Sequence, residues 1–237
     1  MYSVHICALL FTSFICSVFA VNYQLSDNHV GSDFLSSFVH EAIADPTHGR
    51  VTYVDQATAV AQNLTFASGD TLIIASESAV SRHTIRSDIR HMPQGCGTWS
   101  AAWEVGDDWP NLGEADISEL EGVNDQFPNT MILHTSANSN MPAPDDETVT
   151  PTGNNCNVNT SGNTGCGVQA PTADSYGPAF NAIGGGWYAM ERTTTFIKSL
   201  SKVTTLGTPT TFFPNSQCDI NSHFGPNEIV INLTFFE

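Results

Sequence analysis

Four carboxylates fall within eight positions of the segment GEADISELEGVN, residues 113–124: Glu114, Asp116, Glu119 and Glu121. Two carboxylates held about 5 Å apart can cleave a glycosidic bond with retention of configuration. One attacks the anomeric carbon, while the other protonates the leaving oxygen and later activates water. The segment therefore predicts paired-carboxylate chemistry, and the question is which two carboxylates form the pair.

Strand geometry favours one pair. Side chains alternate between the faces of a strand, so Glu114 and Asp116 share a face and an unbroken strand would turn Glu119 away. A one-residue bulge after Asp116 would return Glu119 to that face, with Glu121 following it. Strands rise about 3.3 Å per residue, so the side chains of Glu114 and a bulged Glu119 can lean together and leave about 5 Å between their carboxyl groups. The same estimate leaves on the order of 12 Å between the carboxyl groups of Glu114 and Glu121. The chemistry therefore favours Glu119 as the partner of Glu114. The alternative to a catalytic segment is a solvated acidic edge strand.

Aromatic residues precede the carboxylates. Trp99, Trp103 and Trp109 stand within eleven residues, and flat rings of this kind stack on uncharged sugar rings. Packing in a core is an equally ordinary use of tryptophan. His134, in TMILHTS, could orient a carboxylate or a sugar hydroxyl, or could be a polar residue without a catalytic role.

The sequence pattern predicts that strands hold these residues. Only 13% of the residues are charged, and apolar runs of strand length recur between turn-forming residues without helical periodicity. The runs predict strands at 50–55, 64–67, 71–76, 130–136, 186–198 and 228–236. The polar stretch 137–178 is expected to be a loop closed by a disulfide. This pattern predicts an all-β protein with one core, and it favours a β-sandwich over a barrel.

The charge balance excludes some partners. The chain has 7 Lys and Arg against 24 Asp and Glu, a formal charge of -17, which repels phosphate backbones and anionic membrane surfaces. We therefore expect no nucleic-acid partner and no membrane association of the mature chain. No motif predicts a cofactor or a metal, and a monomer is expected.

An export signal is predicted at the N-terminus. Residues 1–20 contain no charged residue and end with Val18 and Ala20 at the small-residue positions of a secretory cleavage site. We expect residues 21–237 to form the mature, secreted catalytic domain. Three sequons fit this route as candidate N-glycosylation sites, at Asn63, Asn159 and Asn232.

The cysteines of the mature chain fit an oxidising compartment. Their spacing contains no CxxC pair, so disulfides are favoured over zinc. Four cysteines allow three pairings, and the spacing leaves these open. The disulfide candidates are Cys96, Cys156, Cys166 and Cys218.

Several segments resemble the secreted fungal endo-β-1,3-glucanases, or laminarinases, of glycoside hydrolase family sixteen. The likeness is carried by GTWSAAW (97–103), DWPNLGEADISELEGVND (108–125) and LHTSANSNMP (133–142), and it extends over most of the mature chain. It implies a jelly-roll β-sandwich with a β-glucan cleft, and a retaining endo-β-1,3-glucanase that also acts on mixed β-1,3/1,4 glucan.

The same resemblance implies residue roles. The Glu-x-Asp-x-x-Glu signature makes Glu114 the nucleophile, Asp116 the assisting carboxylate and Glu119 the acid/base. The tryptophans at 103 and 109 and the histidine at 134 match positions that line the family's cleft.

The chain departs from the family pattern in places. Two extra residues place Glu121 directly before GVN, so Glu121 is the alternative acid/base, although the signature spacing favours Glu119. Compared with the family pattern, strands are missing after residues 87 and 199 and beyond 237, as are family cysteines near Ser139 and Phe236. We therefore expect the sandwich to be incomplete at its C-terminal strands. The alternative function is a catalytically silent β-glucan-binding or vestigial relative.

Overall fold

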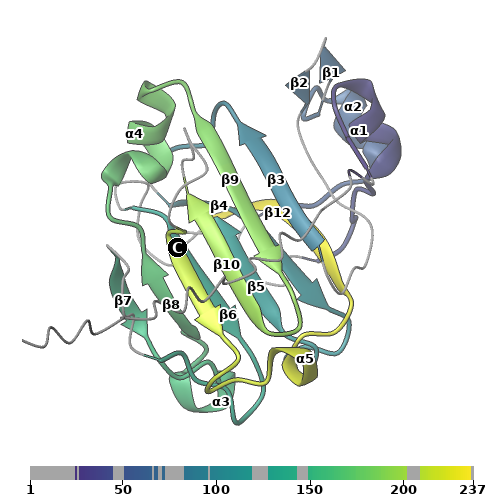
Figure 1. The fold of residues 1–237 in the computed structure, drawn as a ribbon. Coiled ribbons are helices and arrows are strands. Elements are labelled where there is room, and N and C mark those ends of the chain that lie inside the picture. Colours follow the sequence, from purple (N-terminus) through teal and green to yellow (C-terminus); the bar gives the residue numbers. More distant parts are fainter. Residues whose placement is uncertain are drawn as a thin grey trace, which may run out of the picture.

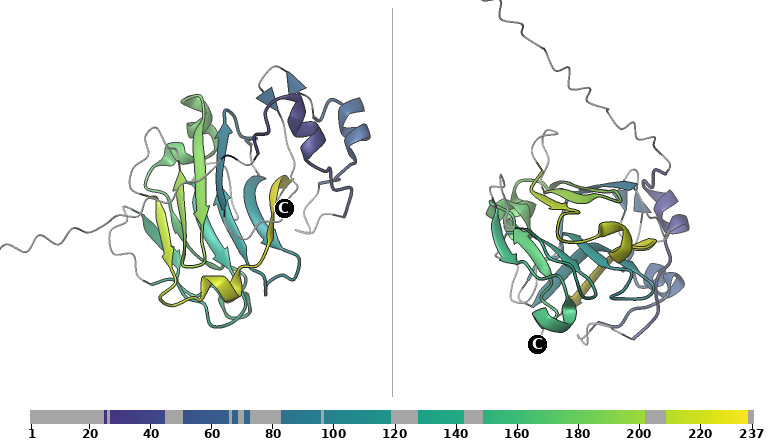
Figure 2. Two further views of the ribbon diagram at one scale, coloured as in Figure 1. Left: turned by 45° about the vertical axis from the view of Figure 1, so that its right-hand side comes forward. Right: turned by 60° about the horizontal axis from the view of Figure 1, so that its bottom comes forward.

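The fold consists of two facing antiparallel sheets with short helices at their edges (Figure 1). The computed structural model describes residues 25, 27–44, 51–65, 67–68, 71–72, 83–95, 97–118, 128–142, 149–201 and 209–235. Figure 2 shows the sheets as two separate layers. The predicted all-β jelly-roll sandwich is therefore confirmed.

Among the described residues, the first sheet has six strands, and it carries the residues of chemical interest. All its strand pairs are antiparallel. In spatial order the strands are β12 (Asn227–Phe235), β4 (Thr98–Gly106), β5 (Glu114–Ser118), β6 (Thr130–His134), β8 (Cys166–Gln169) and β7 (Thr150–Gly153).

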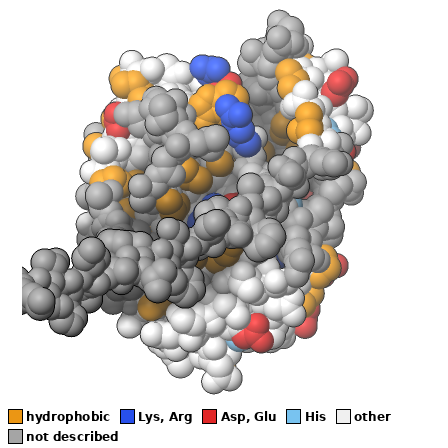
Figure 3. All heavy atoms as spheres, in the orientation of Figure 1, with side chains coloured by type: hydrophobic (Ala, Val, Ile, Leu, Met, Phe, Trp, Pro, Cys, Tyr) orange, Lys and Arg blue, Asp and Glu red, His pale blue; other side chains and the backbone are white. Residues whose placement is uncertain are grey.

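The second sheet has four strands within the described ranges, and it lies in front of the first in Figure 1. In spatial order they are β11 (Thr211–Pro214), β10 (Phe196–Ser201), β9 (Gly186–Arg192) and β3 (His83–Ile89). Among the described residues on the face in front of this sheet, hydrophobic side chains are visible together with Lys or Arg side chains (Figure 3).

The remaining elements are short. A two-stranded ribbon and two helices lie to one side of the sandwich (Figure 1): β1 (Ala67–Ser68), β2 (Thr71–Leu72), α1 (Ser32–Ser37) and α2 (Gln56–Ala61). The others are α3 (Val158–Ser161), η1 (Ala173–Ser175), α4 (Gly177–Ala182) and α5 (Ile220–His223). No helix among the described residues is long and apolar enough to cross a membrane.

The core fills the space between the sheets, because alternate side chains of each strand point toward the opposite sheet. On β5 the inward side chains are Ala115 and Ile117, and both are almost fully buried. They pack with buried residues from β6 and from the four-stranded sheet, including Met131, Leu133, Tyr188, Met190 and Ile197. The opposite face of β5 is therefore free to carry polar side chains.

Some predicted elements were wrong. Residues 51–55 were expected in a strand, but they run without regular structure into α2, whose N-terminus Asp55 caps by accepting a bond from the Thr58 backbone N–H. The stretch 137–178, expected to be a loop, contributes β7 and β8 to the six-stranded sheet. The predicted run 186–198 divides into β9 and β10.

Candidate active site

The carboxylates, a tryptophan and the histidine lie on one face of the six-stranded sheet. In the register of β4, β5 and β6, Asp116 lies opposite Trp103, and Glu114 lies opposite His134. Residues directly opposite each other in antiparallel strands point to the same side. We call this side the carboxylate face; the other side, with Ala115, faces the core.

A β-bulge interrupts β5 after Asp116. Trp103 pairs with Asp116 but Ala102 pairs with Ser118, so Ile117 is the extra residue. The Nδ2 of Asn129 donates to the Ile117 carbonyl at 3.1 Å. The predicted bulge is thus confirmed at the predicted place. The two candidate acid/base residues, Glu119 and Glu121, lie outside the described residues.

Glu114 has an unusual electrostatic environment. Burial raises the pKa of its carboxyl to about 7, because desolvation disfavours the charged form. A hydrogen bond from the Trp109 indole N–H, 2.5 Å from Glu114 Oε2, acts in the opposite direction and stabilises the carboxylate. The side chain of Trp109 itself is 44% exposed and its peptide bond to Pro110 is cis. Trp109 thus reaches over Glu114 from the 107–112 loop.

His134 is held as a neutral ring beside Asp116. Its Nε2 lies 3.5 Å from Asp116 Oδ2, and both side chains are buried. Burial lowers the pKa of His134 to about 4, although a hydrogen bond with Asn163 opposes the shift. Between mildly acidic and neutral pH, His134 therefore stays neutral and adds no positive charge beside Asp116.

These side chains form one compact polar cluster. Ligand atoms of Glu114, Asp116 and His134 lie within 4.8 Å of one another, so the cluster has donor atoms suited to a cation. The same atoms suit nucleophilic chemistry, in which one carboxylate attacks and its neighbours set its charge and orientation.

Trp103 is anchored by residues from distant parts of the chain. Its Nε1 donates to Asn232 Oδ1 at 3.0 Å, and Asn232 Nδ2 donates to the Tyr53 hydroxyl at 3.3 Å. The sequon predicted a glycan on Asn232, but this residue lies within β12 and both ends of its amide are bonded. Asn232 is thus an anchor of Trp103, and glycosylation there stays a prediction. Sequence reasoning missed this role because the sequon was the only signal at Asn232.

The other modification candidates have different surroundings. Asn63 and Asn159 are exposed, so glycosylation there stays a prediction. Cys156 and Cys166 form a disulfide across the segment that contains α3. Cys96 lies outside the described residues.

Cys218 has no cysteine partner among the described residues. Its thiol is buried and accepts a hydrogen bond from Ser139, which lies opposite it in an isolated antiparallel bridge. Burial raises the pKa of this thiol. Ser139 is the position near which the resemblance led us to expect a cysteine.

The chain matches the model of the XgeA-like, catalytic GH16 domain over residues 70–236. A probable glycosidase of Schizosaccharomyces pombe is 35% identical over 91% of this chain and 59% of its own length. A probable endo-1,3(4)-β-glucanase of Neosartorya fischeri is 37% identical over 90% of this chain and 38% of its own length. The chain thus spans between 38% and 59% of the length of these relatives.

Solved structures match over most of both chains. Laminarinase 16A from Phanerochaete chrysosporium, with β-glucans in its donor and acceptor sites, is 57% identical with a TM-score of 0.84, covering 90% of this chain and 84% of its own. An elongating GH family 16 β-1,3-glucosyltransferase is 36% identical with a TM-score of 0.81, covering 90% of this chain and 83% of its own.

Proposed function

We propose that this chain, which belongs to glycoside hydrolase family sixteen, is a retaining endo-glucanase that cuts internal β-1,3 linkages of laminarin-type glucan. One observation carries the proposal: Glu114 and Asp116 share a face of β5, and Glu114 is hydrogen-bonded by the Trp109 indole. This arrangement supports a carboxylate nucleophile beside an aromatic ring.

In the first step, the Glu114 carboxylate attacks the anomeric carbon and the bond from that carbon to the leaving oxygen breaks. A second carboxyl group protonates the leaving oxygen, and we propose Glu119 for this role. The product is a glycosyl ester of Glu114. In the second step, Glu119 takes a proton from water. The water oxygen attacks the anomeric carbon, the ester bond to Glu114 breaks, and the configuration of the sugar is retained overall.

The neighbours of Glu114 have complementary roles. Attack requires the ionised carboxylate, and the Trp109 N–H favours that form against the effect of burial. Asp116 lies two residues along the same face, where its charge and hydrogen bonding influence the ionisation of Glu114. Neutral His134 lies 3.5 Å from Asp116 and does not compensate the charge of that carboxylate.

The substrate class follows from the aromatic residues and the relatives. Trp103 and the half-exposed Trp109 flank the carboxylates and provide surfaces for sugar rings. Laminarinase 16A holds β-glucans in its donor and acceptor sites, and the Neosartorya relative's name includes mixed β-1,3(4) linkages. We propose laminarin as the main substrate and mixed-linkage β-glucan as a second one, acted on by a secreted monomer.

Incubating the purified protein with laminarin and following new reducing ends tests the proposal. We expect product from the wild type and none from Glu114→Gln, which keeps the shape of the side chain but cannot form the glycosyl ester. Binding to insoluble β-1,3-glucan without turnover would instead support the catalytically silent alternative.

Glycosyl transfer is a second candidate activity, because a solved relative at 36% identity is an elongating glucosyltransferase. The same glycosyl ester would react with a sugar hydroxyl in place of water. Chain-length analysis of the laminarin digest separates the two activities, since only transfer yields oligosaccharides longer than a supplied short substrate.

A further inference from the structure

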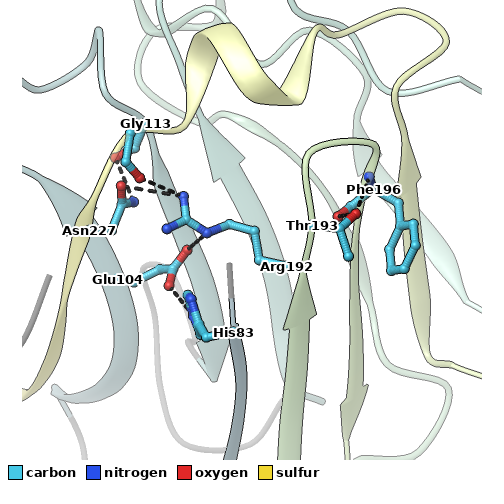
Figure 4. Close-up of polar contacts among 8 residues, drawn as sticks. His83, Glu104, Gly113, Arg192, Thr193, Phe196 and Asn227 are labelled. Atoms are coloured by element: carbon cyan, nitrogen blue, oxygen red, sulfur yellow. Dashed lines mark hydrogen bonds and ion pairs between the residues drawn. The ribbon is translucent and has the colours of Figure 1, made fainter. Parts of the chain in front are cut away.

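A buried ionic cluster of Glu104, His83 and Arg192 lies on the core side of the six-stranded sheet (Figure 4). Arg192 of β9 and Glu104 of β4 are 1% and 0% exposed, and Arg192 Nε lies 2.9 Å from Glu104 Oε1. His83 Nε2 lies 2.8 Å from the other carboxylate oxygen. A buried charge is costly unless it is paired and hydrogen-bonded, so the cluster fixes the guanidinium in one orientation.

The Nη1 atom of that guanidinium faces the segment that leads into β12. Arg192 Nη1 donates to the Gly225 carbonyl at 2.9 Å and lies 3.5 Å from Asn227 Oδ1. Asn227 is fully buried, and its Nδ2 donates to the Gly113 carbonyl at 3.3 Å. The Gly225 N–H donates to the Leu112 carbonyl at 3.1 Å. Two consecutive carbonyls immediately before Glu114 are thus tied to a segment that Arg192 holds.

Gly113 can approach this segment closely because it lacks a side chain. Its φ is +74°, and a Cβ there would lie 2.5 Å from Phe224 Cδ1 and 2.6 Å from the His223 carbonyl oxygen. The backbone before Glu114 therefore lies directly against residues 223–227.

We propose that Asn227 is a positioning residue for the nucleophilic carboxylate: its amide, oriented by Arg192, fixes the Gly113–Glu114 peptide and through it the side chain of Glu114. The peptide group is planar, so the Gly113 oxygen, the Glu114 nitrogen and the Glu114 Cα move together. The Gly113 oxygen accepts two hydrogen bonds, from the Gly106 backbone N–H at 3.0 Å and from Asn227 Nδ2 at 3.3 Å, and together they limit rotation of the plane from which the Glu114 side chain projects. The role of Glu114 in this inference rests on the proposed function.

Asn227→Asp removes this bond with minimal change of shape. The aspartate keeps an acceptor for Arg192 but has no N–H for the Gly113 carbonyl. Because a displacement of about 1 Å at a reacting group can cost 10²-fold in rate, we expect formation of the Glu114 glycosyl ester to slow by about tenfold to a hundredfold. Affinity for laminaritriose should change by less than about twofold, since the aromatic rings are untouched.

Asn181→Asp is the matched control. Asn181 also donates from its Nδ2 to a backbone carbonyl, that of Met92 at 2.9 Å, and it lies in α4 away from the carboxylates. The two variants thus lose the same kind of bond at different places. We expect Asn181→Asp to form the ester at the wild-type rate.

The measurement uses a fluorinated laminaribioside with a dinitrophenyl leaving group, which traps the ester; mass spectrometry locates the label on Glu114. A slower rate of labelling in Asn227→Asp, with unchanged laminaritriose binding, supports the proposal. Arg192→Lys, which can still pair with Glu104 but cannot also reach Gly225, should slow labelling in the same way. Labelling of Asn227→Asp at the wild-type rate, or equal slowing in Asn181→Asp, would overturn it.

Hydrogen exchange keeps the proposal testable if the proposed function fails. If the wild type neither labels nor hydrolyses laminarin, the enzyme proposal is lost. The hydrogen bond from Asn227 to the Gly113 carbonyl, which we call the tether, can still be measured in the peptide that spans residues 107–118. Faster exchange there in Asn227→Asp than in Asn181→Asp supports the tether. Equal exchange in the two variants contradicts it.

Discussion

The hydrogen bond from Trp109 to Glu114 makes a quantitative prediction. Replacing Trp109 by Phe keeps an aromatic ring for the sugar but removes the N–H that lies 2.5 Å from the carboxylate. Because this bond lowers the pKa of Glu114 and burial raises it, its loss should raise that pKa above its present value of about 7.

The size of the change follows from the geometry. A hydrogen bond to a charged group contributes about 1.5 to 3 kcal/mol, and about 1.4 kcal/mol corresponds to one pKa unit. Trp109 is 44% exposed, so water partly replaces the lost bond and the low end of the range applies. The expected shift is about one unit. At about pH 6 the ionised fraction of Glu114 would then fall from roughly 9% to roughly 1%, whereas at about pH 9 the two proteins would react alike.

The assay is the pH dependence of labelling by the fluorinated dinitrophenyl laminaribioside. This leaving group needs no protonation, so the acidic limb of the profile reports the nucleophile in the free enzyme. We expect the limb to move to higher pH by about one unit in Trp109→Phe. Trp103→Phe is the control, because the Trp103 N–H is bonded to Asn232 and not to Glu114. An unmoved limb in Trp109→Phe, or a shift to lower pH, would refute the role of the indole N–H.

Three further predictions follow from the same cluster and its surroundings. Glu119→Ala should lose laminarin hydrolysis but regain turnover of an activated glycoside when azide is added, whereas Glu121→Ala should keep most activity; azide rescue of Glu121→Ala alone would reverse the assignment. Ser139→Cys should oxidise to a disulfide with Cys218 across 79 residues and raise the unfolding free energy by up to about 4.5 kcal/mol in urea titrations, a gain that a reductant should abolish. Because the pKa of His134 is lowered to about 4, the folded protein should lose stability as pH falls from about 6.5 to 4; His134→Gln should escape about 3 kcal/mol of that loss, and parallel pH profiles for variant and wild type would contradict this.

Much of the fold could be predicted because the sandwich follows from local pattern. Apolar runs at 130–136 and 228–236 became β6 and β12, since alternation and β-branched residues are read one strand at a time. The family resemblance is confirmed by the match over residues 70–236. The strand predicted at 51–55 was wrong because TYV has the composition of a strand but no strand among the described residues pairs with it.

Polar partnerships across the sandwich could not be predicted. Arg192 and Glu104 look like surface charges in GWYAMERT and AAWEVG, yet they meet between the sheets from strands almost ninety residues apart. Asn232 and Tyr53 are farther apart still, and both support Trp103. A sequence can place a charge on the core-facing side of a strand, but the strand pairing that brings it a partner depends on the topology of the whole sheet.

The bulge at Ile117 makes the choice of acid/base a question of distance rather than of face. Ser118, the last residue of β5, is 2% exposed and hydrogen-bonds Tyr188 of the opposite sheet, so the bulge has turned it toward the core. Continued alternation predicts the carboxylate face for position 119 and equally for position 121, because the two differ by one full period. Face alone therefore cannot separate Glu119 from Glu121. The distance to the Glu114 carboxyl group can distinguish them, since only a carboxyl group about 5 Å away can protonate the leaving oxygen of the sugar that Glu114 attacks.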